Sequence, residues 1–294
     1  MIRHLISKER KPSRVVIAGA AGFVGGAVAD RLERDGVPVL RLSRREVDLL
    51  APDADSRLMA ILRKSDAFVA AAALAPCTNG DMLVDNMKMA AAMVKALAQA
   101  EVSHVVNISS DAVYADSAEP LTETSCASPG SIHGAMHLAR EVLFQGEIKA
   151  PLAILRPSLL YGAADPHNGY GPNRFRRLAQ KGEDIVLFGE GEERRDHVFI
   201  DDVAELVARV LYRGSVGVLN VATGDVHSFM DVAKIIIKME SGMTNIKTTA
   251  RSGPMPHNGY RPFDPAACRK AFADFRFTSL EAGLKKSMEK AANG

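Results

Sequence analysis

The apolar positions of this chain form short runs separated by longer amphipathic segments. Residues 15–18 are continuously apolar or small, as in a strand buried on both faces of a sheet. The chain pattern predicts further strands at 37–42, 67–70, 102–108, 152–155 and 218–221. Helical spacing follows these runs, from Phe23 onward and over 53–64, 85–100 and 131–148. This alternation predicts an α/β fold built on a doubly wound parallel sheet.

Three glycines separate the first strand from the first helix. Gly19, Gly22 and Gly25 stand between the apolar run and a helical pattern that opens at Phe23 and Val24. Glycines at such positions permit a sharp turn, close approach of a pyrophosphate, and tight packing of helix on strand. The unpaired amides at the helix start would receive the phosphates. The stretch predicts a dinucleotide site, the alternative being a turn that needs glycine only for its positive φ.

The alternation lapses after about residue 160, where glycine and proline crowd residues 162–172. The expected elements beyond are a helix at 173–181, strands at 185–188 and 197–200, a helix at 201–212 with Asp201 as N-cap, and a terminal helix at 279–292. We therefore predict a dinucleotide-binding Rossmann domain over 14–160 plus about 201–225. A smaller C-terminal substrate-binding lobe would take about 161–200 and 226–294, and residues 1–13 would form a lead-in.

Composition narrows the class of protein. The 294 residues carry 37 basic and 35 acidic side chains, and no basic run suggests a nucleic-acid partner. The longest apolar run, 67–75, is too short to span a bilayer, and the N-terminus lacks the apolar core of a signal peptide. Three dispersed cysteines show no metal-ligand spacing and suit a reducing compartment. We expect a cytoplasmic protein without a metal, a membrane or a nucleic acid as partner.

The end of the second strand indicates which cofactor is bound. An acidic residue at this point normally holds the adenosine ribose, but here Ser43 takes the position and Arg44 follows it. A guanidinium offers paired donors to a 2′-phosphate. The sequence therefore favours NADP over NAD, the alternative being a solvated basic turn.

Several motifs resemble the extended short-chain dehydrogenase/reductase family. The Gly-x-x-Gly-x-x-Gly spacing of the first turn is one, and Ser109 to Tyr114 resembles the family's "Ser-Ser/Thr-x-x-Val-Tyr" run. Residues 155–162 resemble "Leu-Arg-x-x-Asn-Val-Tyr-Gly", with Leu159 in place of asparagine, and 188–204 resemble the run that ends "Arg-Asp-Phe-x-x-Val-Asp-Asp-Val-Ala". The motifs fall in the family's order over about 14–290. The resemblance implies an NAD(P)-dependent enzyme of nucleoside-diphosphate sugars.

The resemblance also assigns residues to roles. Ser110 would hydrogen-bond the reacting oxygen of the sugar, and Arg195 would hold its diphosphate, with Asn173 and Tyr161 as further substrate contacts. The cofactor would contact Gly19, Gly22, Phe23, Val24, Gly25, Ser43, Arg44, Asp48, Leu49, Ala71, Ala72 and Pro157. Members often dimerise through helices equivalent to 85–100 and 131–148, so a homodimer is expected.

The catalytic pair of the family is absent. The family writes "Pro-x-Ser-x-Tyr-Gly-x-x-Lys-x-x-x-Glu"; this chain keeps the surrounding residues from Pro129 to Glu141 but has His133 for tyrosine and His137 for lysine. His133 could serve as proton shuttle, because its unperturbed pKa lies near neutrality, with His137 binding the ribose. Alternatively, Asp111 or Ser110 transfers the proton, or the site does no hydride chemistry. No third ligand accompanies the histidines, so a metal site is not expected.

The sequence thus predicts hydride transfer on a nucleoside-diphosphate sugar, by an epimerase or a reductase (an isomerase or an oxidoreductase), with Ser110, Asp111, His133 and His137 as the candidate catalytic residues. The alternative is a catalytically inactive protein that binds the nucleotide or sugar nucleotide in a regulatory or partner role.

Overall fold

A seven-stranded sheet forms the larger part of the molecule in the computed structural model, which describes residues 1–240 and 244–292. Its strands run in the order β1 (Arg3–His4), β10 (Ser215–Val221), β6 (Leu152–Pro157), β5 (His104–Ile108), β4 (Ala67–Ala70), β2 (Val15–Ala18) and β3 (Val39–Leu42). All neighbours pair in parallel except β1, which is antiparallel to β10. The predicted α/β fold with a parallel sheet is confirmed.

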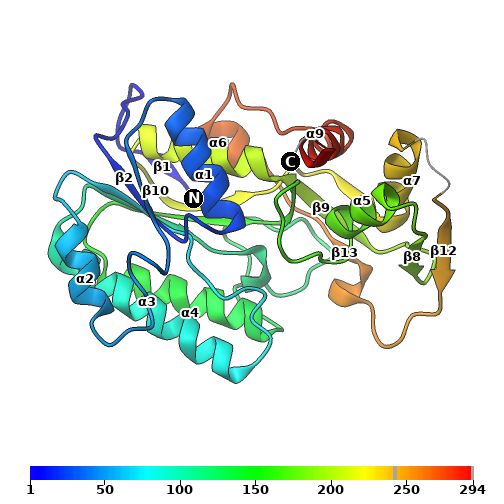
Figure 1. Cartoon of the computed structure of the whole chain (residues 1–294), viewed down its shortest axis with the longest axis horizontal. Coiled ribbons are helices and arrows are strands. Elements are labelled where there is room, and N and C mark those ends of the chain that lie inside the picture. Colours follow the sequence, from blue (N-terminus) through cyan, green and yellow to red (C-terminus); the bar gives the residue numbers. More distant parts are fainter. Residues whose placement is uncertain (241–243, 293–294) are drawn as a thin grey trace.

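Helices cover both faces of this sheet (Figure 1). The helices α1 (Phe23–Arg34), α6 (Ile200–Tyr212) and α8 (Ala266–Ala271) lie on one face. On the other lie α2 (Ala54–Ile61), α3 (Gly80–Ala100) and α4 (Ile132–Glu147). Side chains of β2 alternate between the two layers: Val15 and Ile17 pack toward α1 and α6, whereas Val16 and Ala18 pack toward α3.

The first connection shows how local sequence determines an element boundary. Gly36 has φ +73° after the C-cap Asp35, and the amide of Val37 donates back to the carbonyl of Leu32 at 3.0 Å. This is a Schellman ending, in which glycine takes the left-handed conformation. Because Val37 belongs to this ending, β3 begins at Val39, two residues later than predicted.

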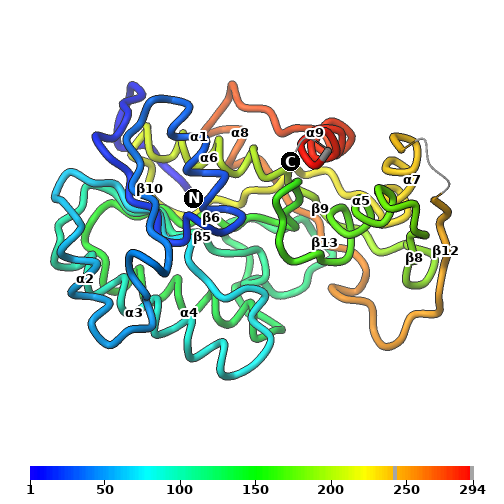
Figure 2. The backbone as a smooth tube through the Cα atoms, in the orientation of Figure 1, coloured from blue at the N-terminus to red at the C-terminus, as the bar shows by residue number. Residues whose placement is uncertain are grey.

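Two smaller sheets and three α-helices make up most of the remaining described residues (right in Figure 2). The first half of β9 (Arg194–Phe199) lies between β11 (Val226–Ser228) and β13 (Tyr260–Arg261), and its second half pairs with β7 (Leu159–Tyr161). β8 (Ile185–Phe188) pairs with β12 (Ile246–Thr249). Around them lie α5 (Pro172–Gln180), α7 (Phe229–Met239) and α9 (Leu280–Ala292). Residues 241–243 and 293–294 of the predicted lobe lie outside the described part of the chain.

Three local predictions differ from the structure. Asp201 is not an N-cap: α6 begins at Ile200, directly after β9, and Asp201 lies in its first turn, where it pairs with Lys290 at 3.0 Å. Helix α7 was not predicted, although Ser228 and Asp231 form a capping box at its start. The lead-in contributes β1, and His4 binds the Ser215 hydroxyl at 2.7 Å.

Candidate active site

The glycine turn after β2 is built around close backbone contacts. A Cβ at Gly19, where φ is +86°, would lie 2.6 Å from the amide nitrogen of Ala72, and one at Gly25 would lie 2.2 Å from the carbonyl oxygen of Gly19. Both positions therefore require glycine. Gly22 is the N-cap of α1 and offers no side-chain cap, and the first turn of α1 contains no acidic residue. The amides of Gly19, Ala20 and Gly22 bond to backbone carbonyls, so the amides that open α1 are the ones left for an anion, which fits the pyrophosphate of a dinucleotide.

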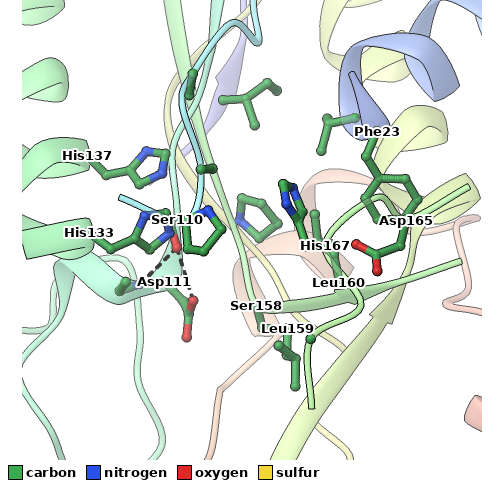
Figure 3. Close-up of a pocket in the computed structure, with 18 of the residues that line it drawn as sticks. Phe23, Ser110, Asp111, His133, His137, Ser158, Leu159, Leu160, Asp165 and His167 are labelled. Atoms are coloured by element: carbon green, nitrogen blue, oxygen red, sulfur yellow. Dashed lines mark hydrogen bonds between the residues drawn. The ribbon is translucent and has the colours of Figure 1, made fainter. Parts of the chain in front are cut away.

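A cavity of about 540 Å³ lies between the carboxyl edge of the large sheet and the four-stranded sheet. Figure 3 shows Ser110, His133 and His137 on one side of it, and Phe23 and His167 on the other. Most of the predicted site residues line this cavity: Gly22, Phe23, Val24, Gly25, Ala71, Ser110, Asp111, His133, His137, Pro157, Asn173 and Arg195. The structure therefore gathers residues from the glycine turn, the end of β5, helix α4 and β9 around one space.

The remaining predicted residues lie outside the cavity. Gly19 and Ala72 contact each other behind the turn. Ser43, Arg44, Asp48 and Leu49 follow β3, where Ser43 donates its hydroxyl to Glu46 at 2.5 Å and Arg44 lies 3.8 Å from Asp48. Arg44 remains 68% exposed, so its guanidinium is available to a ligand at the carboxyl end of β3.

Tyr161, predicted as a substrate contact, does not line the cavity. Its side chain is fully buried among the apolar residues of the smaller part, tilted against Phe199 at 5.5 Å. A Cβ at Gly283 would lie 2.0 Å from the Tyr161 hydroxyl, so that glycine makes room for it. Asn173 lines the cavity, but its amide oxygen accepts from the backbone of Gly162 at 3.0 Å.

Tight packing of α4 against the 3₁₀ turn η1 (Asp111–Val113) positions the catalytic candidates. Ser131 caps α4 by accepting from the amide of Gly134 at 3.1 Å, which places His133 in the first turn and His137 one turn later. A Cβ at Gly134 would lie 2.0 Å from the carbonyl oxygen of Ala112. The absence of a side chain at Gly134 therefore lets the start of α4 lie directly against η1.

His133 is half-buried and held by a backbone donor. The amide of Cys77 donates to Nδ1 of His133 at 3.3 Å. A neutral imidazole that accepts at Nδ1 carries its hydrogen on Nε2. Burial lowers the pKa of His133, and His167 adds to this effect while the Asp111 carboxylate opposes it. The ring is thus neutral near pH 7, with Nε2–H as its donor.

His137 is more deeply buried, at 6% exposure, and its Nδ1 has no partner among the described residues. Burial lowers its pKa well below the usual value, with smaller contributions from His133 and Arg140. His137 therefore carries no charge at neutral pH, unlike the lysine that the family pattern has in its place.

A series of ion pairs beside the cavity joins η1 and the residues just after it to residues 257–261. Arg261 binds the Asp111 carboxylate at 2.8 Å and Asp116 at 3.0 Å, and Asp116 in turn contacts His257 at 2.5 Å. Arg195 is buried, bonded to Glu193 and to the carbonyl of Pro256. Asp111 thus binds the Arg261 guanidinium through Oδ2 and accepts from the Ser110 hydroxyl through Oδ1 at 3.3 Å. The ion pair stabilises its charged form, which leaves it a poorer candidate for proton transfer than His133.

The lining residues that the sequence analysis missed include three with titratable or charged side chains on which the site depends: His167, His257 and Arg261. His167 lies in the glycine- and proline-rich stretch after β7, whose composition was the only signal available. His257 and Arg261 come from the end of the chain, more than a hundred residues from Asp111, and no spacing predicts that contact.

The described residues form neither a metal-binding cluster nor a membrane-spanning helix. Within residues 1–240 and 244–292, no three or more His, Cys, Asp or Glu side chains are grouped as a metal site would require. The same ranges contain no helix with the length and apolar character needed to cross a bilayer.

Turn, sheet and cavity together define an α/β dinucleotide-binding protein. The model of the "NAD dependent epimerase/dehydratase family" matches residues 15–222, and the chain belongs to this family. The extended short-chain dehydrogenase/reductase resemblance is thereby confirmed.

Relatives in this family act on nucleotide sugars. One is a trifunctional UDP-glucose 4,6-dehydratase, 3,5-epimerase and reductase of Arabidopsis thaliana, 24% identical over 95% of this chain and 47% of its own length. The chain thus spans about half of that plant relative. Another is a dTDP-4-dehydro-6-deoxy-D-allose reductase of Streptomyces bikiniensis, 27% identical over 76% of this chain and 80% of its own.

The fold is shared with solved structures. A GDP-L-fucose synthetase from Naegleria fowleri superposes with a TM-score of 0.87 at 17% identity, covering 99% of this chain and 98% of its own. Another similar structure contains UDP-glucose and NAD, and a further one is bound to NADP. At these identities the likeness establishes the fold.

Proposed function

We propose that the protein modifies a nucleoside-diphosphate sugar by hydride transfer with NADP, and that carbonyl reduction is the direction its site supports best. The observation that carries this proposal is the contact between the Cys77 amide and Nδ1 of His133. Because that contact leaves a hydrogen on Nε2, the neutral ring offers a donor to a carbonyl oxygen rather than a base to a hydroxyl. Epimerisation would need the opposite tautomer in its oxidation step.

A bound nicotinamide would supply the hydride to the carbonyl carbon. Nε2–H of His133 and the hydroxyl of Ser110 would both donate to the carbonyl oxygen, where negative charge develops. The amide of Ala112 donates to Oγ of Ser110 at 3.1 Å, and the Ser110 hydroxyl itself donates to Asp111 at 3.3 Å (Figure 3), so it would turn from Asp111 to the carbonyl oxygen. The proton that completes the product hydroxyl would come from water through Ser110, and the hydroxide that remains would be neutralised by the solvent.

The rest of the substrate would extend toward β9 and β13. Arg195 and Arg261 line that side of the cavity, and guanidinium groups suit a diphosphate. Leu159 lines the same cavity and is 37% exposed, where the family pattern has an asparagine. We infer that the sugar meets an apolar surface there, which favours a deoxy sugar over one with a hydroxyl at that point.

Preference for NADP is supported at the end of β3. Ser43 stands in the position where an acidic residue would bind a ribose 2′-hydroxyl and donates its own hydroxyl to Glu46, while Arg44 is exposed beside it. An arginine here would bind a 2′-phosphate by charge-assisted hydrogen bonds.

The test is turnover of the purified protein with NADPH or NADH and 4-keto sugars linked to UDP, dTDP or GDP. We expect oxidation of NADPH with at least one of them, and a loss of about a hundredfold in His133→Ala with cofactor binding intact. Gln145→Ala, on an exposed position of α4, serves as the matched control. Unchanged turnover in His133→Ala would contradict the proposed role.

A second function has one observation in its favour. Neither His137 nor His133 can carry the charge of the family's lysine, since burial lowers the pKa of both. We therefore keep a nucleotide-binding protein without turnover as the alternative. It predicts calorimetric binding of NADP or of a sugar nucleotide, with no oxidation of NADPH for any sugar tested.

A further inference from the structure

Arg140 is the largest fully buried side chain near the active site, and its surroundings are unusual. It lies on α4, three residues after His137, and is 2% exposed. Its guanidinium donates to three oxygens: the Asn107 side chain at 2.7 Å, the Ala70 carbonyl at 2.7 Å and the Ala72 carbonyl at 2.6 Å. These oxygens belong to the carboxyl ends of β4 and β5, directly behind the cavity-lining residues Ala71 and Ser110.

The charge of this guanidinium is uncompensated. In the part of the chain that the structure describes, no carboxylate forms an ion pair with Arg140; its other close contact is the ring of Phe144, 5.5 Å away. The neighbouring Glu141 is already bound to Arg156 at 2.5 Å and to Ser109 at 2.5 Å. Burial lowers the pKa of Arg140 only to about 10, so the group stays protonated at neutral pH.

We propose that Arg140 is a positioning residue that supplies the fixed positive charge of the cofactor site, beneath a His133–His137 pair that carries none. This inference deepens the proposed function and rests on it for the identity of the cofactor. The charge that a lysine at position 137 would bring is here located one turn further along α4, bound to the strand ends instead of facing the ligand.

Two consequences follow from a fixed cation in a site of low dielectric. It opposes protonation of the adjacent His137, which keeps that ring uncharged beside His133. It also disfavours the oxidised nicotinamide, which is positively charged, relative to the reduced form, which has a neutral ring. A reductase that must bind reduced cofactor and release oxidised cofactor benefits from both effects.

Asn107 offers a test that separates charge from structure. Its Oδ1 accepts from Arg140, and its Nδ2 has no hydrogen-bond partner among the described residues. Asn107→Asp therefore keeps every hydrogen bond of the guanidinium and adds a compensating carboxylate. Arg140→Lys makes the complementary change, because it keeps the charge and loses most of the hydrogen bonds.

The first measurement is the ratio of the dissociation constants for NADP⁺ and NADPH, by calorimetry and by fluorescence of the reduced form. From Coulomb attraction alone, we expect Asn107→Asp to lower the ratio of the NADP⁺ to the NADPH dissociation constant about tenfold. Arg140→Lys, which keeps the charge, should leave this ratio within about twofold of the wild type. An unchanged ratio in Asn107→Asp, or an equal change in both variants, would overturn the inference in favour of a purely structural role.

The second measurement needs no cofactor. The charged and titratable groups that face His133 and His137 are Arg140 on the same helix, Asp111 on η1 and His167 in the loop after β7. Nuclear magnetic resonance of the histidine nitrogens should show the His137 ring titrating at higher pH in Asn107→Asp and unchanged in Arg140→Lys. If the wild-type protein binds neither cofactor form, the proposed function fails, yet this titration still tests the cation. No shift in Asn107→Asp would overturn it.

Discussion

The imidazole rings of His133 and His137 meet edge to face, with centroids 4.7 Å apart and planes at 90°. Both rings are neutral at physiological pH, so the contact is one between aromatic groups and not between charges. The pair occupies the two positions where the family pattern places tyrosine and lysine. In this pair, His133 is a hydrogen-bond donor at the cavity and His137 is its uncharged neighbour. The positive charge near them comes from Arg140.

Restoring lysine alone should harm the protein. His137→Lys would bury a second cation beside Arg140, and we expect it to lower the free energy of unfolding by about 2 kcal/mol or more. Combining it with Arg140→Gln should recover at least about 1 kcal/mol of that loss. Urea unfolding of the wild type, both single variants and the double variant measures the coupling. Strict additivity would contradict electrostatic repulsion between the two positions.

The Asp111 carboxylate should matter little for proton transfer. Because Arg261 holds it, Asp111→Asn keeps an acceptor for the guanidinium, and we expect kcat within about fivefold of the wild type. Steady-state kinetics across a range of pH values provide the measurement. A loss comparable to that of His133→Ala, with a changed pH profile, would instead identify Asp111 as the acid or base.

Arg44 should discriminate between cofactors. Removing its guanidinium in Arg44→Ala should weaken NADP binding about tenfold while NAD binding stays within about twofold. Arg63 is also exposed, but it precedes β4 and so lies at the amino ends of the parallel strands, away from Arg44. Arg63→Ala therefore controls for the loss of one positive charge. Equal weakening by the two variants would remove Arg44 from the binding site.

His197 should make stability depend on pH. Burial lowers the pKa of this fully enclosed ring to about 3, and neither ring nitrogen has a partner among the described residues. Between about pH 6.5 and pH 3 the unfolded chain binds a proton at His197 that the folded chain does not, so stability falls as pH decreases through this window. At higher pH the ring is neutral in both states and the effect disappears.

His197→Phe tests this sign. The phenyl ring would pack on Phe229, which lies 5.8 Å from the imidazole. We expect the variant to gain about 1–2 kcal/mol more over the wild type at about pH 5 than at about pH 7.5. Chemical unfolding at the two pH values decides the matter, and an equal gain at both would show that His197 does not contribute to the acid sensitivity.

The sequence pattern predicted those elements of the fold that depend on residues close together in the chain. The parallel strands of the large sheet, the glycine turn and the start of α4 each depend on residues close together in sequence, and their predicted positions are close to those observed. The strand β1 and its partner β10 are separated by about two hundred residues, so nothing near Arg3 could indicate the pairing. The missed helix α7 is different, because its capping box was present in the sequence.

The same distinction applies to the site. Ser110, His133 and His137 could be recognised because two short motifs carry them, and the structure brings both motifs to one cavity. Arg140 lies within the second motif, but its burial depends on which strand ends α4 covers. Tyr161 was predicted from its motif to contact the substrate. In the structure, the space beside Gly283 lets its side chain pack in the core instead.

The contact between Gly134 and the Ala112 carbonyl bears on how such a site can change over time. Since the backbone itself fixes where the helix begins, substitutions at positions 133 and 137 leave the placement of whatever side chains stand there untouched. In such a protein, the reactive side chains can be replaced while the backbone of the site stays the same. Directed evolution from this scaffold should therefore accept uncharged side chains at those two positions without moving the helix start, and leave the glycine alone.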